Sequence, residues 1–279
     1  MERTMPVCTQ TAAINIMNTS SHSSWISPLA TAGYAAKGVV YAIIGVLAAM
    51  SAFGSGGSIN SSEGALQEIR MASLGGILLI IVGIGLLAYG IYRLLGAFAD
   101  IESEGNDETG VAKRLGYFGS GLSYCGLAIA AFGGLGGGGE KSLTAKVLAM
   151  PFGAWLVGLL GAAIIVAGLQ QWVKAITGKY ASKFSLDRYT ADKRKWIERI
   201  AKLGLAARGI VFPIIGFFLI RAAMQGDASE TTGIGGALVT LAQQDYGTLL
   251  LGITATGLAC YGIYCWVLAI YGRWHQFSK

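Results

Sequence analysis

The chain has 279 residues, of which 53% are hydrophobic and only 13% are charged, and its formal net charge is +6 at pH 7. Because roughly a quarter of the residues of a soluble domain are charged, this composition excludes an ordinary soluble protein and indicates a membrane protein. The two histidines, His22 and His275, lie outside the apolar runs described below. A haem, chlorophyll or catalytic zinc site with histidine ligands inside those runs is therefore excluded.

The N-terminal segment, residues 1–30, is rich in Ser, Thr, Asn and Gln. It has no apolar stretch of the signal-peptide type before the first long apolar run. We expect it to form a mobile polar tail on the cytoplasmic side of a membrane.

Six apolar runs follow, and each approaches or exceeds the roughly 20 residues that cross the hydrocarbon core of a bilayer. They cover residues 31–53, 74–99, 115–135, 152–176, 202–224 and 246–271. None alternates polar and apolar residues as barrel strands do, and helices satisfy their own backbone hydrogen bonds in lipid. The sequence therefore predicts an all-α membrane protein with six transmembrane helices.

Two of the connections between these runs have distinctive compositions. Residues 101–112 form an acidic cytoplasmic loop, which we interpret by default as solvated acids; pairing with basic residues of 178–199 or with a partner protein is the alternative. GGLGGGGEKS at 133–142 resembles a phosphate-binding loop, but Glu140 interrupts the required Gly-Lys-Ser/Thr order. We interpret it as a flexible turn.

A third connection, residues 178–199, is strongly basic. Apolar residues recur at helical spacing from Trp196 to Leu203, which predicts an interfacial helix leading into the next apolar run. Anionic headgroups attract such cations with about 1 kcal/mol each. The predicted lipid contacts are Lys193, Arg194, Lys195 and Arg199. We predict no nucleic-acid partner, because the usual excess of cations on cytoplasmic flanks already accounts for this charge.

Basic residues are distributed unevenly between the two sides of the predicted helices. Four of the 21 Lys and Arg residues lie in the odd-numbered connections or at their helix ends, namely Arg70, Lys141, Lys146 and Arg221. Since cytoplasmic flanks are enriched in Lys and Arg, we expect both termini, including the tail at 274–279, to be cytoplasmic.

The apolar runs contain an internal repeat. GYAAKGVVYAIIG at 33–45 matches GYFGSGLSYCGLA at 116–128 and GLAARGIVFPIIG at 204–216. In the even-numbered runs a glycine recurs four residues before an aromatic residue, in the pairs Gly85 and Tyr89, Gly168 and Trp172, and Gly257 and Tyr261. We therefore predict three two-helix repeats, 31–100, 113–177 and 200–273. Two spans return the chain to its starting side, so the repeats are parallel and related by a pseudo-threefold axis along the membrane normal.

These segments resemble a bacterial integral-membrane family known as domain of unknown function 1206. Its three tandem repeats open with Gly-Tyr-Ala-Ala-Lys/Arg-Gly-Val-Val-Tyr-like segments and close with Gly-Leu-x-x-Tyr-Gly-like segments. The openings at 33–41 and 204–212 and the closings at 85–90 and 257–262 fit this pattern, whereas the middle repeat departs from it. The resemblance covers roughly residues 30–273. It implies the six-span fold and a bacterial inner (plasma) membrane, and it implies no known reaction.

A candidate binding site comes from the odd-numbered runs. Residues four apart lie only about 40° apart around a helix. The fourth residue after the glycine that opens each odd-numbered segment therefore lies on the same face of the helix as that glycine. These residues are Lys37, Ser120 and Arg208, and the aromatic layer beside them consists of Tyr41, Tyr124 and Phe212. If the three faces meet at the axis, the cluster is a site for an anion or a lipid headgroup. The interpretation that we favour over this site is that the two cations extend separately to the headgroups, since they lie only about 8 Å from the helix start.

Glycine is abundant, with 42 residues, and we interpret most of them as sites of close helix packing. The alternative is that glycine grooves beside aromatic residues of the even-numbered runs hold a lipid, a quinone or a carotenoid. This groove comprises Gly85, Tyr89, Gly168, Trp172, Gly257 and Tyr261. We predict no cofactor and no metal.

The catalytic inventory is sparse, because no Asp or Glu lies deep in an apolar run. We therefore expect a non-enzymatic accessory or scaffold subunit that interacts with membrane lipids and with a membrane-protein partner or a second copy of itself. The alternative is a channel or transporter for a small anion or a lipid, with its cationic site on the pseudo-threefold axis.

Overall fold

The computed structural model of the chain describes residues 7–59, 62–102, 104–133, 139–178 and 191–272. Within these ranges the regular elements are helices, and no strand is present. In chain order they are α1 (Val7–Ala52), α2 (Ser62–Met71), α3 (Gly75–Phe98), α4 (Glu108–Ala131), α5 (Gly139–Leu148), α6 (Gly153–Thr177), α7 (Ala191–Gln225), the 3₁₀ helix η3 (Ala228–Glu230), α8 (Ile234–Ala242) and α9 (Gly247–Tyr271). The all-α prediction is confirmed for this part of the chain.

Five of the described helices are long and apolar enough to cross a membrane. They are Ile26–Ala52 of α1, the whole of α3 and α6, Asp192–Gln225 of α7, and α9. Helix α4 is 24 residues long, but its glycines, serines and charged first turns make it less apolar than these five. The prediction of six spans is therefore not confirmed.

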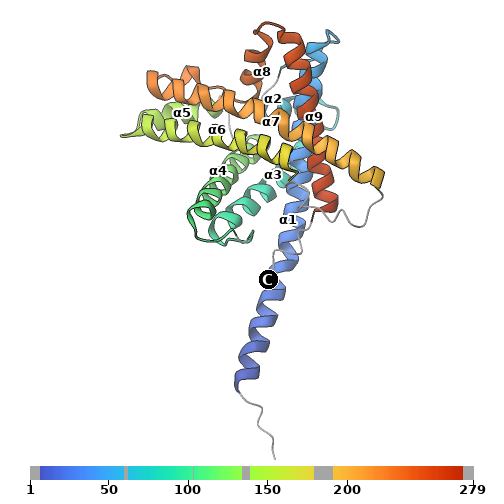
Figure 1. Cartoon of the computed structure of the whole chain (residues 1–279), viewed down its shortest axis with the longest axis vertical. Helices are drawn as coiled ribbons and strands as arrows, with labels where there is room; N and C mark the ends of the chain where they lie inside the picture. Colours follow the sequence, from blue (N-terminus) through green and yellow to red (C-terminus); the bar gives the residue numbers. More distant parts are fainter. Residues whose placement is uncertain (1–6, 60–61, 103, 134–138, 179–190, 273–279) are drawn as a thin grey trace, which may run out of the picture.

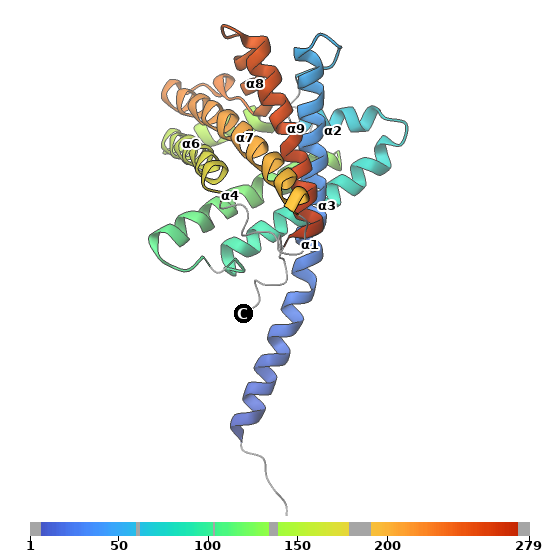
Figure 2. The same ribbon diagram turned by 45° about the vertical axis from the view of Figure 1, so that its right-hand side comes forward.

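Helix α1 begins at Val7 and extends well beyond its apolar part. Residues 7–30, predicted as a mobile tail, are thus helical, and in Figures 1 and 2 this end of α1 projects away from the other helices. Residues 1–6 and 273–279 lie outside the described residues, and so do 179–190 of the basic connection. Helix α7 runs unbroken from Ala191 into the fifth apolar run, so the helix predicted before that run is continuous with it.

Each repeat contains a short helix that we did not predict from the sequence. Helices α2, α5 and α8 lie before α3, α6 and α9, and each of the long helices begins with a glycine, at Gly75, Gly153 and Gly247. The glycine N–H donates to the carbonyl oxygen three residues earlier, at 2.8, 2.9 and 2.8 Å. A Cβ on these glycines would lie 2.3, 1.9 and 2.0 Å from a carbonyl oxygen of the preceding short helix. The tight turn therefore requires glycine. Helix α5 also makes residues 139–142 of the predicted flexible turn helical, while 134–138 lie outside the described residues.

The long helices pair across the repeat boundaries. Helix α3 packs along α4, α6 along α7, and α9 along α1, so the last helix of each repeat lies beside the first helix of the next. Figures 1 and 2 show these three pairs running in different directions. The predicted arrangement of three parallel repeats around a pseudo-threefold axis is not confirmed.

Within a repeat, the two long helices pack together in the first and third repeats, whereas α4 and α6 share no more than marginal contact. The opening glycines show the difference. A Cβ on Gly33 would lie 2.5 Å from the Cβ of Tyr89, and one on Gly204 would lie 2.6 Å from the Cα of Tyr261. The corresponding Gly116 has no such neighbour within 4 Å. We call α1 with α3 and α7 with α9 the closed hairpins, and α4 with α6 the open hairpin.

Glycine contacts also correct the predicted alignment of the second repeat. A Cβ on Gly90 would meet Cys125, one on Gly168 would meet Pro213, and one on Gly262 would meet Ala42. These three neighbours lie five residues after Ser120, Arg208 and Lys37, respectively. Positions 90, 168 and 262 are therefore equivalent. Trp172 therefore corresponds to Leu94 and Trp266. Its predicted equivalence to Tyr89 and Tyr261 is wrong by five positions, and the residue at the tyrosine position of the second repeat is Ala167.

Candidate functional site

The two cations of the predicted site, Lys37 on α1 and Arg208 on α7, point into the protein. Their side chains belong to residues that are only 3% and 8% exposed. Lys37 Nζ donates a hydrogen bond to the Tyr89 hydroxyl at 3.1 Å, and Arg208 Nη1 donates one to the Tyr261 hydroxyl at 2.6 Å. Since Tyr89 and Tyr261 occupy equivalent positions, the first and third repeats contain the same cation–tyrosine pair.

Aromatic rings surround both cations. Lys37 Nζ lies 5.9, 5.9, 4.6, 5.1 and 5.5 Å from the ring centroids of Tyr34, Tyr41, Tyr89, Tyr124 and Tyr261. Arg208 Cζ lies 5.5, 4.3 and 4.5 Å from those of Tyr41, Phe212 and Tyr261. Because Tyr41 and Tyr261 contact both, the cations meet in one place, which we call the cation centre. The predicted aromatic layer thus lies within it.

Ser120, the third member of the predicted site, lies on α4 one turn before Tyr124 and is half-buried. Among the described residues its hydroxyl takes part in no hydrogen bond. The second repeat therefore contributes the Tyr124 ring to the cation centre, but neither a cation nor a hydroxyl bonded to one.

The cation centre has hydrogen-bond donors without acceptors. Arg208 Nε is buried and has no hydrogen-bond partner within the described part of the chain. Neither Lys37 nor Arg208 pairs with a carboxylate of those residues. Aromatic faces attract cations but carry no net negative charge, and an uncompensated buried charge is costly. The centre thus offers positive charge and N–H donors, the groups that bind an anion.

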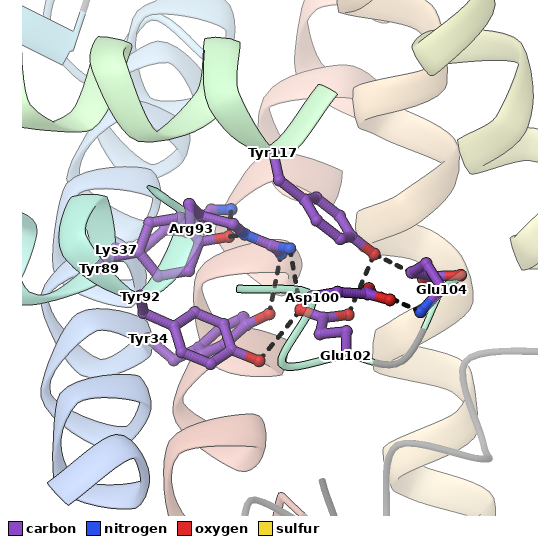
Figure 3. Close-up of polar contacts among 9 residues, drawn as sticks. All are labelled: Tyr34, Lys37, Tyr89, Tyr92, Arg93, Asp100, Glu102, Glu104 and Tyr117. Atoms are coloured by element: carbon purple, nitrogen blue, oxygen red, sulfur yellow. Dashed lines mark hydrogen bonds and ion pairs between the residues drawn. The ribbon is translucent and has the colours of Figure 1, made fainter. Parts of the chain in front are cut away.

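A third cation, the largely buried Arg93 on α3, was not singled out from the sequence. Its Nε donates to the Tyr89 hydroxyl at 2.9 Å and its Nη2 to the Tyr34 hydroxyl at 3.2 Å. Its Nη1 forms an ion pair with Glu102 at 3.1 Å, and the two side chains are 12% and 6% exposed. The Tyr89 hydroxyl therefore joins this network to Lys37, as Figure 3 shows.

The carboxylate of Glu102 is the acceptor at the centre of the Arg93 network. It also accepts hydrogen bonds from the hydroxyls of Tyr92 at 3.0 Å and Tyr117 at 3.1 Å (Figure 3). The default interpretation of the acidic loop as solvated acids is thus wrong for Glu102, whose partner is Arg93. The sequence signal that could have found this ion pair is Arg93, a cation one turn after Tyr89 within an apolar run, with Glu102 nine residues further on.

Other acids hold the same loop in place. Asp100 accepts the backbone N–H groups of Glu104 at 2.8 Å and Gly105 at 3.0 Å, and Glu104 pairs with Lys113. Asp107 is the N-cap of α4 and accepts the Gly110 N–H. The Thr109 hydroxyl, and to a lesser extent that N–H, hold the pKa of Asp107 below its usual value.

The predicted groove for an apolar ligand is not brought together as one surface. Gly85 packs against Ala36 and Gly257 against Ala207, each within its own repeat, whereas Gly168 packs against Pro213 of the next repeat. Tyr89 and Tyr261 belong to the cation centre, while Trp172 lies against Gly209 and is 41% exposed. The misalignment of the second repeat explains the difference.

The predicted lipid-contacting cations lie on the first turns of α7. Lys193, Arg194, Lys195 and Arg199 are all exposed. Arg194 forms an ion pair with Glu198 at 3.0 Å, and Arg199 Cζ lies 6.0 Å from the Trp196 ring. This end of α7 therefore presents its charges to the outside of the protein.

The three-repeat organisation agrees with comparisons to known proteins. A family model described as Domain of Unknown Function (DUF1206) matches residues 32–100, 115–178 and 203–272. The chain belongs to this family. It is also similar to an uncharacterized protein, YxxB, of Bacillus subtilis (strain 168), with 40% identity over 252 residues that cover 88% of this chain and 91% of the relative. No solved structure matches this DUF1206 protein.

Proposed function

We propose that this protein is a non-enzymatic integral protein of the inner membrane, with both termini cytoplasmic, that binds an anion in the cation centre. The observation that supports this most strongly is the pair of buried cations, Lys37 and Arg208, that share aromatic neighbours and have no carboxylate partner among the described residues. An anion between them supplies the missing negative charge and accepts the Arg208 Nε–H. If the anion moves across the membrane, the protein is a channel or transporter. If the anion stays bound in the cation centre, the protein is a binding protein.

Anion flux through liposomes tests the transport form of this proposal. We expect the parent protein to carry phosphate or chloride and the Lys37→Ala, Arg208→Ala double variant to lose this flux. Lys146→Ala with Lys202→Ala is the matched control, because it removes the same charge from two exposed positions. Equal flux through parent and double variant contradicts transport through the centre.

Thermal unfolding in detergent tests binding itself. Because a ligand that binds the folded state stabilises it in proportion to RT ln(1 + [L]/Kd), phosphate or chloride should raise the unfolding midpoint of the parent and of the control. The Lys37→Ala, Arg208→Ala variant should show no such rise. A parent midpoint that no anion shifts, at constant ionic strength, contradicts the proposal.

A second candidate is the accessory or scaffold role, which the exposed face of α6 favours. Of the five apolar helices, α6 has the smallest share of buried residues, and its outward side chains include Trp155, Leu159 and Leu169. Such a face contacts lipid or another membrane protein. Native mass spectrometry after gentle extraction separates these cases: a protein that always emerges as a solitary monomer contradicts the scaffold role.

A further inference from the structure

The second repeat lacks the cation–tyrosine pair that the other two repeats share. In the first repeat Lys37 bonds to Tyr89, and in the third Arg208 bonds to Tyr261. The equivalent positions of the second repeat hold Ser120 and Ala167. The second repeat thus has two small side chains at the sequence positions where each closed hairpin has a long cation and a tyrosine.

The open hairpin exposes this position. A Cβ on Gly116 or Gly119, within one turn before Ser120, would meet no neighbouring atom within 4 Å. The same construction on Gly33 collides with Tyr89 in the first repeat. No other part of the described chain therefore contacts α4 closely at these two glycines.

Helix α4 also borders the cation centre directly. Tyr124 is half-buried, and its ring centroid lies 5.1 Å from Lys37 Nζ and 4.6 Å from the ring of Tyr89. One side of α4 thus contacts the cations through Tyr124, whereas Leu115 and Leu122 on its outer side are 67% and 61% exposed.

We propose that an oxyanion of the phosphate class takes the place of the missing third pair, entering between α4 and α6 and accepting a hydrogen bond from the Ser120 hydroxyl. This inference rests on the proposed function and locates its ligand. The Arg208 Nε–H and the Lys37 ammonium belong to the cation centre, and Ser120 lies one turn before Tyr124 on the helix that borders this centre. A tetrahedral oxyanion has enough oxygen atoms to accept from all three groups. Its source is either free phosphate or the phosphate of a lipid headgroup.

Rebuilding the third pair tests the inference. The double variant Ser120→Lys with Ala167→Tyr fills the position with the side chains of the first repeat, so we expect it to bind the oxyanion at least about tenfold more weakly although it adds a positive charge. The matched control is Ser123→Lys with Ala163→Tyr, which places the same side chains at exposed positions of the same two helices. The control should bind like the parent.

The probes are inorganic phosphate at constant ionic strength and vesicles of phosphatidylglycerol, with phosphatidylcholine vesicles for comparison. The readout is the shift of the thermal unfolding midpoint. A shift with inorganic phosphate identifies the free oxyanion as the ligand, and a shift with phosphatidylglycerol alone identifies the headgroup. Either result supports the inference, provided that the rebuilt variant loses the shift and the control keeps it.

Two results overturn the inference. If the rebuilt variant keeps the full shift while Lys37→Ala, Arg208→Ala loses it, anion binding stands but the ligand does not occupy the second repeat. If neither probe shifts the parent, the inference falls, and the proposed function falls with it only if chloride gives no shift either. Should the rebuilt variant fail to fold, Ser120→Ala replaces it, and an unchanged affinity of that variant contradicts the role of the hydroxyl; a loss of about tenfold supports it.

Discussion

The first and second hairpins are built on the same repeat, yet one is closed and the other is open. In the first, Tyr89 packs against Gly33 and its hydroxyl accepts hydrogen bonds from both Lys37 and Arg93. In the second, Ser120 and Ala167 replace the lysine and the tyrosine, and α4 separates from α6. A shared pattern of glycines therefore specifies where helices turn and cross. The large side chains between them decide whether a hairpin closes.

The comparison also separates two kinds of buried cation. Arg93 has a carboxylate partner, Glu102, and both side chains are largely buried. Lys37 and Arg208 have aromatic faces and phenol hydroxyls as neighbours. The first arrangement contains its own counter-charge and suits a structural role. The second leaves two buried cations without a carboxylate partner among the described residues, which is why we propose that an anion binds there.

The largest expected effect comes from breaking the buried ion pair of the first hairpin. Glu102→Gln leaves Arg93 buried without a counter-charge, so we expect the free energy of unfolding to fall by about 3 kcal/mol. Gln171→Ala, at the position of Arg93 in the second hairpin, should change it by less than about 1 kcal/mol. Unfolding by increasing SDS in mixed micelles measures both. Equal losses of unfolding free energy in Glu102→Gln and Gln171→Ala would show that the first hairpin does not depend on its ion pair more than the second depends on Gln171.

The closed contact of the first hairpin can be tested with one methyl group. Gly33→Ala places a Cβ 2.5 Å from that of Tyr89, so we expect a loss of about 2 kcal/mol from overpacking. Gly116→Ala meets no neighbour and should gain about 0.5 kcal/mol from its higher helix propensity. The same micelle assay applies. A destabilised Gly116→Ala variant would mean that the second hairpin is closed in the membrane.

A smaller effect is expected from the shared hydroxyl. Tyr89→Phe removes the acceptor of two cations, and hydrogen bonds to charged groups contribute more than neutral ones, so we expect a loss of about 1.5 kcal/mol. Tyr124→Phe alters a ring in the same centre whose hydroxyl has no hydrogen bond among the described residues, and it should cost less than about 0.5 kcal/mol. Both are measured by unfolding at constant anion concentration. A reversed order would contradict the role given to Tyr89.

The smallest effect concerns the start of the open hairpin. The pKa of Asp107 is held below its usual value of 3.8 by the Thr109 hydroxyl and the Gly110 N–H. Its carboxylate therefore stabilises the folded state above its unfolded pKa, and this contribution disappears as the pH falls through the lower folded value. Unfolding of the parent below about pH 4 should thus depend more steeply on pH than unfolding of Asp107→Asn. Identical pH profiles of the parent and Asp107→Asn would show that the Asp107 cap does not stabilise α4.

Several features of the fold were predictable because they depend on local patterns. The apolar runs predicted five of the long membrane-type helices, and the recurrence of GYAAKG-like segments predicted three repeats. The cations Lys37 and Arg208 were found by their position within that repeat. Glu102 and Arg93 were missed, since a loop acid next to several others is usually solvated and nothing in the local sequence shows that Tyr92 and Tyr117 close around it.

By itself, the sequence determined the helical class, the three repeats and the positions that carry charge, because hydrophobicity and periodicity are properties of neighbouring residues. Only the tertiary structure decided that long helices pair across repeat boundaries, that Trp172 is not equivalent to Tyr89, and that the second hairpin is open. These features depend on contacts between residues far apart in the chain. The tertiary structure also decided the direction of the Lys37 and Arg208 side chains, because a side chain points inward or outward according to the rings and hydroxyls of the neighbouring helices.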